Sequence, residues 1–114
     1  MSNRTSSARI SELMTLPATL RPIEPVSRAM ELLQRPKAYE VFIADENEVL
    51  GVVTIRDILK AGDIARTKIC SLMSRVPKLD AEDSVDAAAK IMTDHRVRAV
   101  PIVENDRLVG QLTA

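Results

Sequence analysis

The sequence has few of the residues that build covalent, metal or aromatic sites. It contains one cysteine, Cys70, and one histidine, His95, which excludes an internal disulfide and effectively excludes structural zinc. Tryptophan is absent, and Tyr39 and Phe42 are the only aromatic residues, so the stacking platforms typical of single-stranded nucleic-acid binding are missing. We therefore predict no metal site and no nucleic-acid partner.

Long hydrophobic runs and an excess of one charge are also missing. No apolar run reaches the roughly 18 to 20 residues that a transmembrane helix needs, and the polar start MSNRTSSAR lacks the apolar core of a signal peptide. The 16 basic and 16 acidic side chains balance, so no net field attracts nucleic acid or anionic membrane. These features predict a soluble, cytoplasmic protein without membrane insertion.

Recognisable catalytic groups are lacking as well. The sequence shows no nucleophile with a neighbouring base and no phosphate loop of the Walker type. We predict that the chain is not an enzyme, has no catalytic residues and requires no cofactor. With 114 residues it is long enough for one core and too short for two independent ones, so any internal repeat must share a core with its partner.

An internal repeat is present. Shifting the sequence by 59 positions aligns residues 10–54 with 69–113 without a gap, and ten of the 45 pairs are identical, against roughly three expected by chance. The identical pairs are mostly apolar residues or glycine, as expected for two copies with the same backbone. Their members in the first copy are residues 10, 13, 14, 20, 26, 29, 41, 43, 51 and 54. The pattern indicates a duplication.

Both copies show the same order of local patterns. A short apolar stretch leads through a proline region into an extended segment, and an amphipathic helix follows. Two β-rich runs then flank a polar turn, DENE in the first copy and ENDR in the second, which is typical of a hairpin. A strand, a crossover helix and a hairpin predict a small mixed sheet whose first strand runs parallel to the second.

Helix boundaries follow from the residues at the helix starts. Pro25 suits the first position of the first helix, and Asp83, with Asp86 three residues later, suits the N-cap of the equivalent helix. After Thr54 the apolar spacing predicts another helix that extends to about residue 65 and is interrupted near Gly62.

This order of elements resembles the cystathionine-β-synthase (CBS) domain pair, or Bateman module. The resemblance rests on Val100-Pro101-Ile102-Val103-Glu104, which matches the family's apolar-Pro-apolar-apolar-acidic strand, and on Gly51, Thr54 and Asp57, which match its Gly-x-x-Thr-x-x-Asp ending. It implies an α/β fold with a mixed sheet, built from two tandem β-α-β-β-α repeats related by pseudo-twofold symmetry. The predicted boundaries are a tail over 1–9 and repeats over 10–66 and 67–114.

The chain departs from the family pattern at two places. Phe42 occupies a strand position where the family often has proline. After Thr113 the sequence stops at Ala114, so the aspartate and the closing helix expected in the second repeat are missing. We expect that the second repeat is truncated and that the chain is a fragment of a longer protein or a clipped module.

The resemblance implies an adenine-nucleotide site with one competent cleft. Threonine at a strand end and aspartate in the next helical turn suit a ribose, and a helix N-terminus suits phosphate. By resemblance Thr54, Arg56 and Asp57 would face sugar and phosphate, and Arg96 or Arg98 could also bind phosphate. The adenine pocket would use Val76, Pro77, Arg98, Ala99 and Pro101.

A second, weaker cleft would draw on Pro17, Ala18, Tyr39, Glu40, Phe42 and Thr113. It lacks its aspartate, and Glu40 would repel phosphate if its side chain points into the cleft. Other interpretations stay open for several of these residues. Asp57 could simply cap the helix after Thr54, and Arg96 and Arg98 could lie on a solvated strand edge.

The function implied by the resemblance is regulatory sensing of AMP, ADP, ATP or S-adenosylmethionine, with control of an attached or partner protein of unknown identity. An alternative is a ligand-free dimerisation or interaction scaffold, because family members pair through their helices. In either case a homodimer is expected. A third interpretation is a regulatory insert or tail of an enzyme or transporter.

Overall fold

A computed structural model of the chain describes residues 9–36 and 38–114, which form two compact units. One unit is continuous and consists of Pro17–Arg75. The other combines the segment that ends at Leu16 with Val76–Ala114. The segment that opens each repeat therefore belongs to the unit that holds the strands of the other repeat.

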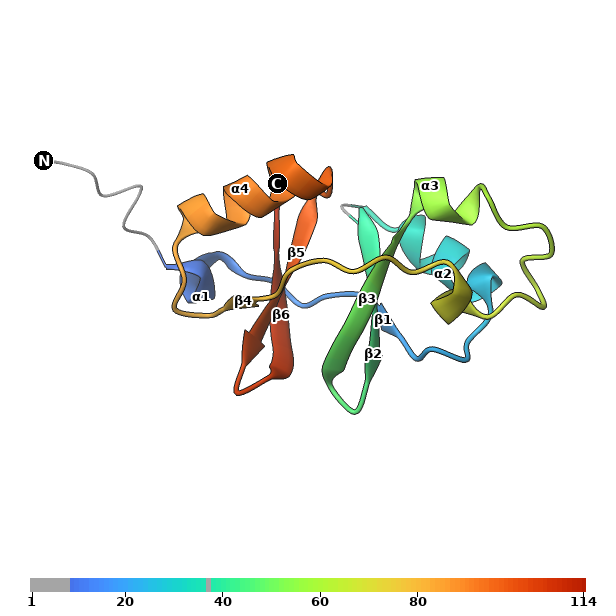
Figure 1. Cartoon of the computed structure of the whole chain (residues 1–114), viewed down its shortest axis with the longest axis horizontal. Coiled ribbons are helices and arrows are strands. Elements are labelled where there is room, and N and C mark those ends of the chain that lie inside the picture. Colours follow the sequence, from blue (N-terminus) through green and yellow to red (C-terminus); the bar gives the residue numbers. More distant parts are fainter. Residues whose placement is uncertain (1–8, 37) are drawn as a thin grey trace, which may run out of the picture. The chain divides into compact units, whose positions relative to one another are not determined.

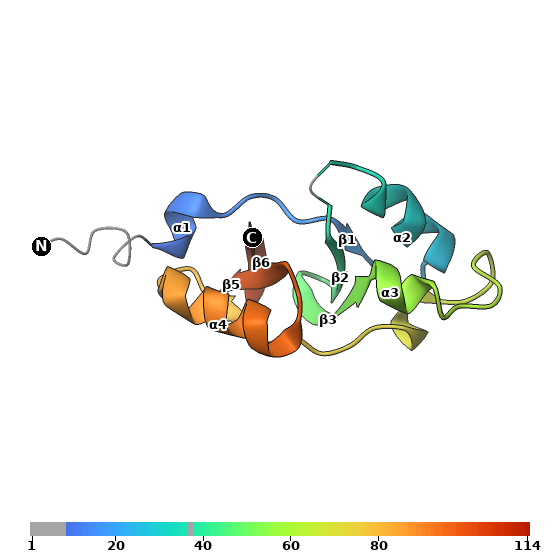
Figure 2. The same cartoon turned by 90° about the horizontal axis from the view of Figure 1, so that it is seen from above.

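The continuous unit contains one three-stranded sheet in the order β1-β2-β3. β1 runs parallel to β2, and β2 and β3 form an antiparallel hairpin. Helices α2 and α3 lie on the same side of this sheet in two perpendicular views (Figures 1 and 2). In chain order the elements are β1 (Thr19–Leu20), α2 (Val26–Leu33), β2 (Glu40–Asp45), β3 (Glu48–Thr54), α3 (Ile55–Ile58) and the 3₁₀ helix η1 (Ile69–Ser71).

The discontinuous unit repeats this topology in the sheet β4-β5-β6. β4 is parallel to β5, and β5 and β6 form the hairpin. Its elements are α1 (Ile10–Leu13), β4 (Leu79–Asp80), α4 (Val85–His95), β5 (Ala99–Glu104) and β6 (Arg107–Thr113). The predicted strand, crossover helix and hairpin are confirmed in both units, as is the mixed α/β fold class.

The two hairpins share their fine structure. Each turn has two residues with positive φ, Glu46 and Asn47 in one unit and Asn105 and Asp106 in the other. Positive φ at both positions matches the right-handed twist of the flanking strands, and asparagine and aspartate tolerate it well. Both hairpins also carry a bulge at the same place, after Ile43 and after Ile102.

The short segments that open the repeats extend the sheets by one bridge each. Ser74 exchanges two backbone hydrogen bonds with Val52 of β3, at 2.8 and 2.9 Å. At the equivalent place Thr15 exchanges two with Gln111 of β6, both at 2.8 Å. These bridges cover sheet edges that would otherwise expose unpaired backbone groups.

The expectation that the two repeats share one core is wrong, because each unit has its own core between its helices and one face of its sheet. In the continuous unit Val26 and Ala29 of α2 pack with Val41, Ile43 and Val53 of the hairpin. In the discontinuous unit the core consists of Ile10, Leu79, Ala81, Ala88, Val100, Ile102 and Leu112. The 59-residue offset of the sequence thus relates two cores of the same design.

Two helix starts differ from the prediction. Pro25 is the N-cap of α2 and not its first helical residue. Ser84, and not Asp83, is the N-cap of α4, because its hydroxyl accepts the backbone N–H of Ala87 at 3.2 Å. The Asp83 carboxylate instead accepts the N–H of Asp80 at 2.9 Å, so it stabilises the turn that leads into the helix.

The cap supplies a first test of the fold. We expect Ser84→Ala to lower the free energy of unfolding by about 1 kcal/mol, because it removes an acceptor from the first turn of α4. Urea denaturation followed by circular dichroism measures the change. Thr93→Ala removes an exposed hydroxyl that donates to the Ala89 carbonyl, at 3.1 Å, within the same helix. It should cost nothing, because alanine is the better helix former. Equal losses in both variants would contradict the assignment of Ser84 as the cap.

The helix after Thr54 is shorter than predicted. α3 covers only Ile55–Ile58, and the chain turns at Leu59 and Lys60, before Gly62 is reached. Residues 63–67 then form a turn in which the carboxylate of Asp63 accepts the N–H groups of Ala65 and Arg66 at 3.1 and 3.3 Å. The interruption at Gly62 was therefore predicted one turn too late.

Candidate functional site

The predicted strand residues of the sites share one face of each sheet. Side chains along a strand alternate between its two faces. Because Val41, Ile43 and Val53 point into the core of the continuous unit, their neighbours Glu40, Phe42, Val52 and Thr54 lie on the opposite face. In the discontinuous unit the same reasoning places Ala99, Pro101, Gln111 and Thr113 opposite the core. We call this the site face of each sheet.

The junction of β3 and α3 brings Thr54 and Asp57 together. Thr54 is the last residue of β3 and the N-cap of α3, and Asp57 is the third residue of that helix. The carboxylate oxygen Oδ2 of Asp57 accepts the backbone N–H of Thr54 at 2.8 Å and its hydroxyl at 3.1 Å. The capping interpretation of Asp57 is thus confirmed. Both residues are half-buried, so the carboxylate is held in place at the surface.

Glu40 lies directly beside this junction. It pairs with Thr54 across the antiparallel hairpin, which places both side chains on the site face. Glu40 is only 4% exposed, and it is the one buried charged residue among those that the structure describes. The Thr54 hydroxyl thus bonds the carboxylate of Asp57, and the paired position of the neighbouring strand carries the buried Glu40. The exposed Arg56 stands between Thr54 and Asp57 in the chain. Hydroxyl groups of a sugar suit such acceptors, whereas phosphate needs the basic residues.

In the discontinuous unit the residues at the start of β5 form the corresponding surface. Ala99 pairs with Thr113, and Pro101 pairs with Gln111. Ala99 and Pro101 are buried, and the backbone N–H of Ala114 donates to the carbonyl of Arg98 at 2.8 Å, which ties β6 to the residue before β5. The place of Glu40 is taken by Ala99, so this surface is small and apolar where the other is acidic.

Phe42 and Pro101 create a backbone difference between the two units. In the continuous unit the N–H of Phe42 donates to the carbonyl of Ala18 at 2.9 Å. The aligned residues are Pro101 and Pro77, and proline has no N–H, so this hydrogen bond cannot form there. The Pro77 carbonyl therefore lacks the backbone donor that Phe42 gives to the Ala18 carbonyl in the other unit. Pro77 itself is exposed. Phe42 itself is fully buried.

The basic residues near this surface belong to the loop between α4 and β5. Arg96 is the left-handed C-cap of α4, with φ of 56°, and Arg98 precedes β5. Both side chains are exposed. The backbone N–H groups of Arg96 and Val97 both donate to the carbonyl of Met92, so the loop has a defined backbone.

The structure groups the predicted residues by unit. Thr54, Arg56 and Asp57 lie together at the β3–α3 junction, with Tyr39 and Glu40 at the start of the adjacent strand. The others form a second group around the start of β5 and the residues before β4: Val76, Pro77, Arg98, Ala99, Pro101 and Thr113. Pro17 and Ala18 precede β1, where Ala18 packs against the core and not toward the site face. A role in binding stays a prediction for all of them.

Sequence reasoning missed Gln111. Its side chain lies on the site face beside Pro101, and its amide group donates to the carbonyl of Leu16 at 3.4 Å. The alignment of the repeats pairs Gln111 with Val52. A polar residue opposite an apolar one in this alignment could have indicated Gln111 as a site residue.

Residues 9–36 and 38–114 contain neither a metal-ligand cluster nor a membrane-spanning helix. Within these ranges no three His, Cys, Asp or Glu side chains are grouped so that they could hold a metal ion. None of the helices in these ranges has the length and apolar character needed to cross a membrane.

The comparison with known families decides the classification. The sequence profile of the CBS domain matches residues 10–64 and again residues 68–114. The chain belongs to the CBS domain family. Each match spans one of the two sequence repeats, and the solved structures that resemble the chain are CBS domain pairs.

Three relatives illustrate the similarity. The chain is 30% identical to inosine-5'-monophosphate dehydrogenase of Staphylococcus haemolyticus, over 89% of this chain and 22% of that enzyme. The CBS domain protein of Pyrobaculum aerophilum in complex with AMP is 25% identical, with a TM-score of 0.83 over 93% of this chain and 87% of that one. The CBS domain pair of protein MJ0100, in complex with 5'-methylthioadenosine and S-adenosyl-L-methionine, is 25% identical, with a TM-score of 0.79 over 93% and 89%. This chain thus spans about a fifth of the length of the dehydrogenase from Staphylococcus haemolyticus.

Proposed function

We propose that the chain is a regulatory module that binds an adenine nucleotide or a related adenosyl compound. Its CBS relatives form complexes with AMP and with S-adenosyl-L-methionine, two ligands that share the adenosine moiety. Binding shifts the conformation or assembly of an attached or partner protein, and the chain itself performs no catalysis. It requires no cofactor for this role.

The arrangement of Thr54 and Asp57 carries the proposal. Their hydrogen bonds fix one carboxylate oxygen and orient the hydroxyl at the start of α3. A preformed acceptor pair of this kind suits the two vicinal hydroxyls of ribose, because little freedom is lost when the sugar binds. Arg56, exposed beside them, supplies the guanidinium for phosphate.

The residues around β5 supply the adenine-binding part of the proposal. Val76, Ala99 and Pro101 are apolar, as a base-binding surface requires. The Pro77 carbonyl, which no N–H at position 101 can reach, is an acceptor that suits the exocyclic amine of adenine. Arg98 and Arg96 complete this group as phosphate ligands. The weaker cleft predicted from the sequence, which has Glu40 in place of Ala99 and no aspartate after Thr113, binds weakly or not at all.

Calorimetric titration tests the function. We expect one of AMP, ADP, ATP and S-adenosylmethionine to bind at about one site per chain. Asp57→Asn should weaken this binding about 10- to 100-fold, because the amide loses the charge that strengthens hydrogen bonds to ribose, while its oxygen can still cap α3. The melting temperature without ligand should stay the same.

Asp63→Asn is the matched control for this titration. Asp63 also accepts backbone N–H groups in the same unit, but it lies in the turn after α3 and not on the site face. Its substitution should leave the affinity unchanged. If both variants bind like the wild type, Asp57 does not belong to the site; if no adenosyl compound binds the wild type, the sensing function is wrong.

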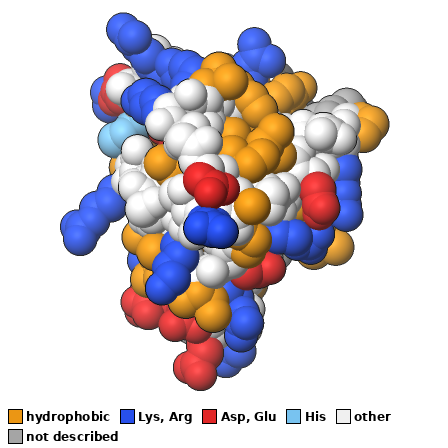
Figure 3. Space-filling model, turned by 90° about the vertical axis from the view of Figure 1, so that its right-hand side faces the viewer, with side chains coloured by type: hydrophobic (Ala, Val, Ile, Leu, Met, Phe, Trp, Pro, Cys, Tyr) orange, Lys and Arg blue, Asp and Glu red, His pale blue; other side chains and the backbone are white. Residues whose placement is uncertain are grey.

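The exposed face of α3 favours a second candidate function, a dimerisation scaffold without a ligand. Ile55 and Leu59, one helical turn apart, are 51% and 78% exposed. Hydrophobic side chains interrupt the charged surface at the end of the unit that carries α2 and α3 (Figure 3). Large apolar side chains that gather at a surface often mark a protein contact.

Sedimentation velocity distinguishes the scaffold. We expect Leu59→Glu to convert a homodimer into monomers, since it places a charge in the apolar contact. Ala65→Glu adds the same charge at another exposed position of the unit and should leave the dimer intact. A wild-type chain that is monomeric at high concentration would exclude this second function.

A further inference from the structure

The carboxyl end of the parallel strand pair β1–β2 carries a pocket of about 360 Å³. Its walls are the end of β1, the loop that leads into α2 and the turn between β2 and β3, and its lining includes Leu20, Arg21, Glu24, Ala44, Glu46 and Asn47. The volume lies in the range of roughly 300–1,000 Å³ that small-molecule sites occupy. All of these residues belong to the continuous unit.

The pocket is distinct from the candidate site in the same unit. Leu20, the last residue of β1, lies beside Ile43, so the residues that follow it approach the turn after β2. Thr54 stands at the other end of β3, the strand that begins at Glu48 after this turn. A strand rises about 3.3 Å per residue, which puts about 20 Å between the turn and Thr54. A small ligand in the pocket therefore does not reach Thr54.

Two opposite charges line the pocket without pairing with each other. Within residues 9–36 and 38–114, neither the Arg21 guanidinium nor the Glu46 carboxylate takes part in a hydrogen bond or an ion pair, and both residues are exposed. Glu24 differs, because its carboxylate accepts the backbone N–H of Arg21 at 2.8 Å and lies 3.9 Å from Nε of Arg28. A cation and an anion from two separate loops are thus available to a ligand.

The other unit builds the same turn without this pair of charges. There the carboxylate of Asp83 accepts the N–H of Asp80 at 2.9 Å, which repeats the bond between Glu24 and Arg21. Asp80, which is aligned with Arg21, uses its own carboxylate for the N–H of Glu82 at 3.0 Å. The turn therefore needs no guanidinium, and the fold does not account for the Arg21 side chain.

Two further differences between the copies concern the pocket walls. Val103 is aligned with Ala44, and Asn105 with Glu46. The smaller side chain of Ala44 leaves more room in the pocket. Glu46 has a φ of 49°, a left-handed backbone that asparagine tolerates and that glutamate adopts at a cost. Unfavourable backbone positions of this kind cluster at ligand sites.

We propose that this pocket binds a small α-amino acid with a short aliphatic side chain. The carboxylate of the amino acid pairs with the Arg21 guanidinium, whose planar fork matches it, and the ammonium group pairs with the Glu46 carboxylate. Leu20 and Ala44 supply an apolar wall for the side chain. A zwitterion fits because a simple anion would meet Glu24 and Glu46, and a simple cation would meet Arg21. This binding does not depend on the proposed nucleotide function.

NMR titration of the isotope-labelled full chain tests the site, with L-alanine, L-valine and L-leucine as probes. We expect at least one of them to cause saturable shifts of the backbone amides of Arg21, Ala44 and Asn47, while the amide of Thr54 stays in place. The C-terminal amide and the N-acetyl derivative of that amino acid each lack one charge. Both should bind about tenfold more weakly or worse, because each loses a charge-assisted hydrogen bond.

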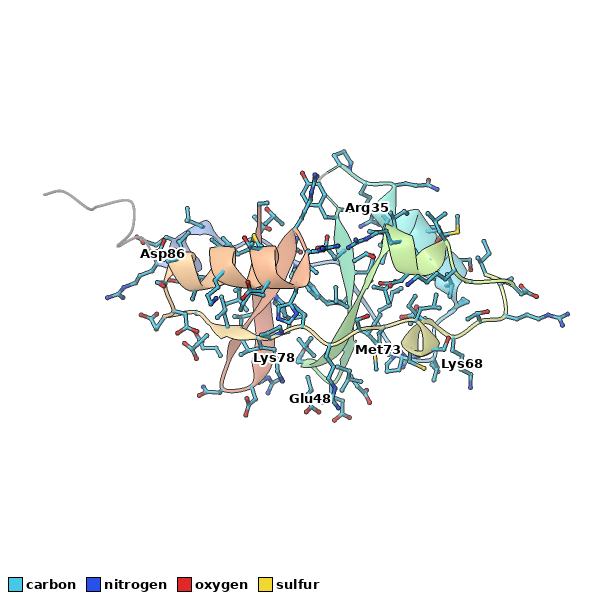
Figure 4. All side chains as sticks on the ribbon, turned by 45° about the horizontal axis from the view of Figure 1, so that its top comes forward. Arg35, Glu48, Lys68, Met73, Lys78 and Asp86 are labelled. Carbon is cyan, nitrogen blue, oxygen red and sulfur yellow. The ribbon has the colours of Figure 1, made fainter. Side chains whose placement is uncertain are left out.

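Three variants connect the binding with the two charges. Glu46→Asn introduces the residue type of Asn105; it should weaken binding about tenfold or more, while the melting temperature stays equal or rises, because asparagine suits the left-handed backbone. Arg21→Gln should weaken binding to the same degree. Glu48→Gln is the matched control, since it removes a carboxylate next to the turn but outside the pocket lining (Glu48 is labelled in Figure 4). Its affinity should stay that of the wild type.

Several results would overturn the proposal. One is that none of the three amino acids causes saturable shifts, and another is that the shifts appear at Thr54 and not around the pocket. The zwitterion is the wrong ligand class if either the amide or the N-acetyl derivative binds as tightly as the free amino acid, since one charge then suffices. Binding like that of the wild type in Arg21→Gln or Glu46→Asn would also exclude the proposed contacts.

Discussion

Ile43→Ala should lower the free energy of unfolding by about 2–5 kcal/mol, the range observed when a large aliphatic side chain is truncated in a packed core. Ile43 is fully buried in β2, the central strand of its sheet, and packs in the core with Val26 and Ala29 of α2. The strand pairs with Leu20 on one side and Gly51 on the other at this residue, so the backbone can hardly move to fill the cavity.

Ile55→Ala is the matched control. It removes the same atoms from the same unit, but Ile55 is 51% exposed on α3. We expect a change within about 0.5 kcal/mol, as for most surface substitutions. Urea unfolding of both variants, followed by circular dichroism, measures the difference. Similar losses in the two variants would mean that β2 does not lie at the centre of the core.

Gly51→Ala should cost about 1–3 kcal/mol, because the added methyl group overfills a space that is already packed. A Cβ atom at Gly51 would lie 2.9 Å from both the Met73 sulfur and the Ser74 carbonyl oxygen. Met73 is labelled on the segment that runs beside β3 (Figure 4). That segment is held by two backbone hydrogen bonds to Val52, so it cannot withdraw without losing them.

Substitutions of the two other glycines provide the comparison for Gly51→Ala. Gly62→Ala places its methyl group in open space at a negative φ and should be neutral or slightly stabilising. Gly110→Ala should lie between the two, since the closest atom is the flexible Met14 sulfur at 2.8 Å and the backbone carbonyl of Thr15 is 3.1 Å away. Melting temperatures of the three variants give the order. A Gly51 variant as stable as the Gly62 variant would contradict the close approach of Met73 and Ser74 to Gly51.

Much of the fold could be predicted because the repeat doubles every local pattern. The helix of each copy, the hairpin turns and the parallel first strand all follow from spacing and turn residues, and all are present. The start of α4 was off by one residue because Asp83 and Ser84 are both suited to capping. The start of α2 was off by one residue because Pro25 lies just before the helix and not in its first position. The length of α3 depends on turns that its short apolar pattern does not encode.

The candidate site could be predicted in its residue types but not in its contacts. The motif that contains Thr54 and Asp57 was evident from the sequence, whereas the hydrogen bonds that join them depend on the cap geometry. The pairing of Glu40 with Thr54 depends on hairpin register, and the unused Pro77 carbonyl becomes visible only when the two units are compared. The polar Gln111 was overlooked because its repeat partner is a valine.

The edge bridges have a consequence for the order of folding. Ala18, Phe42, Val52 and Ser74 lie in one row across the sheet of the continuous unit. Backbone hydrogen bonds join Ala18 to Phe42 and Val52 to Ser74, and Phe42 lies opposite Val52 in the hairpin. Three strand spacings of about 4.8 Å place the two ends of this unit only about 14 Å apart. The other unit must join residues on both sides of this long insertion, and closing such a loop costs entropy in the unfolded chain. Once the continuous unit has formed during synthesis, that loop is already closed, so the discontinuous unit can form without this cost.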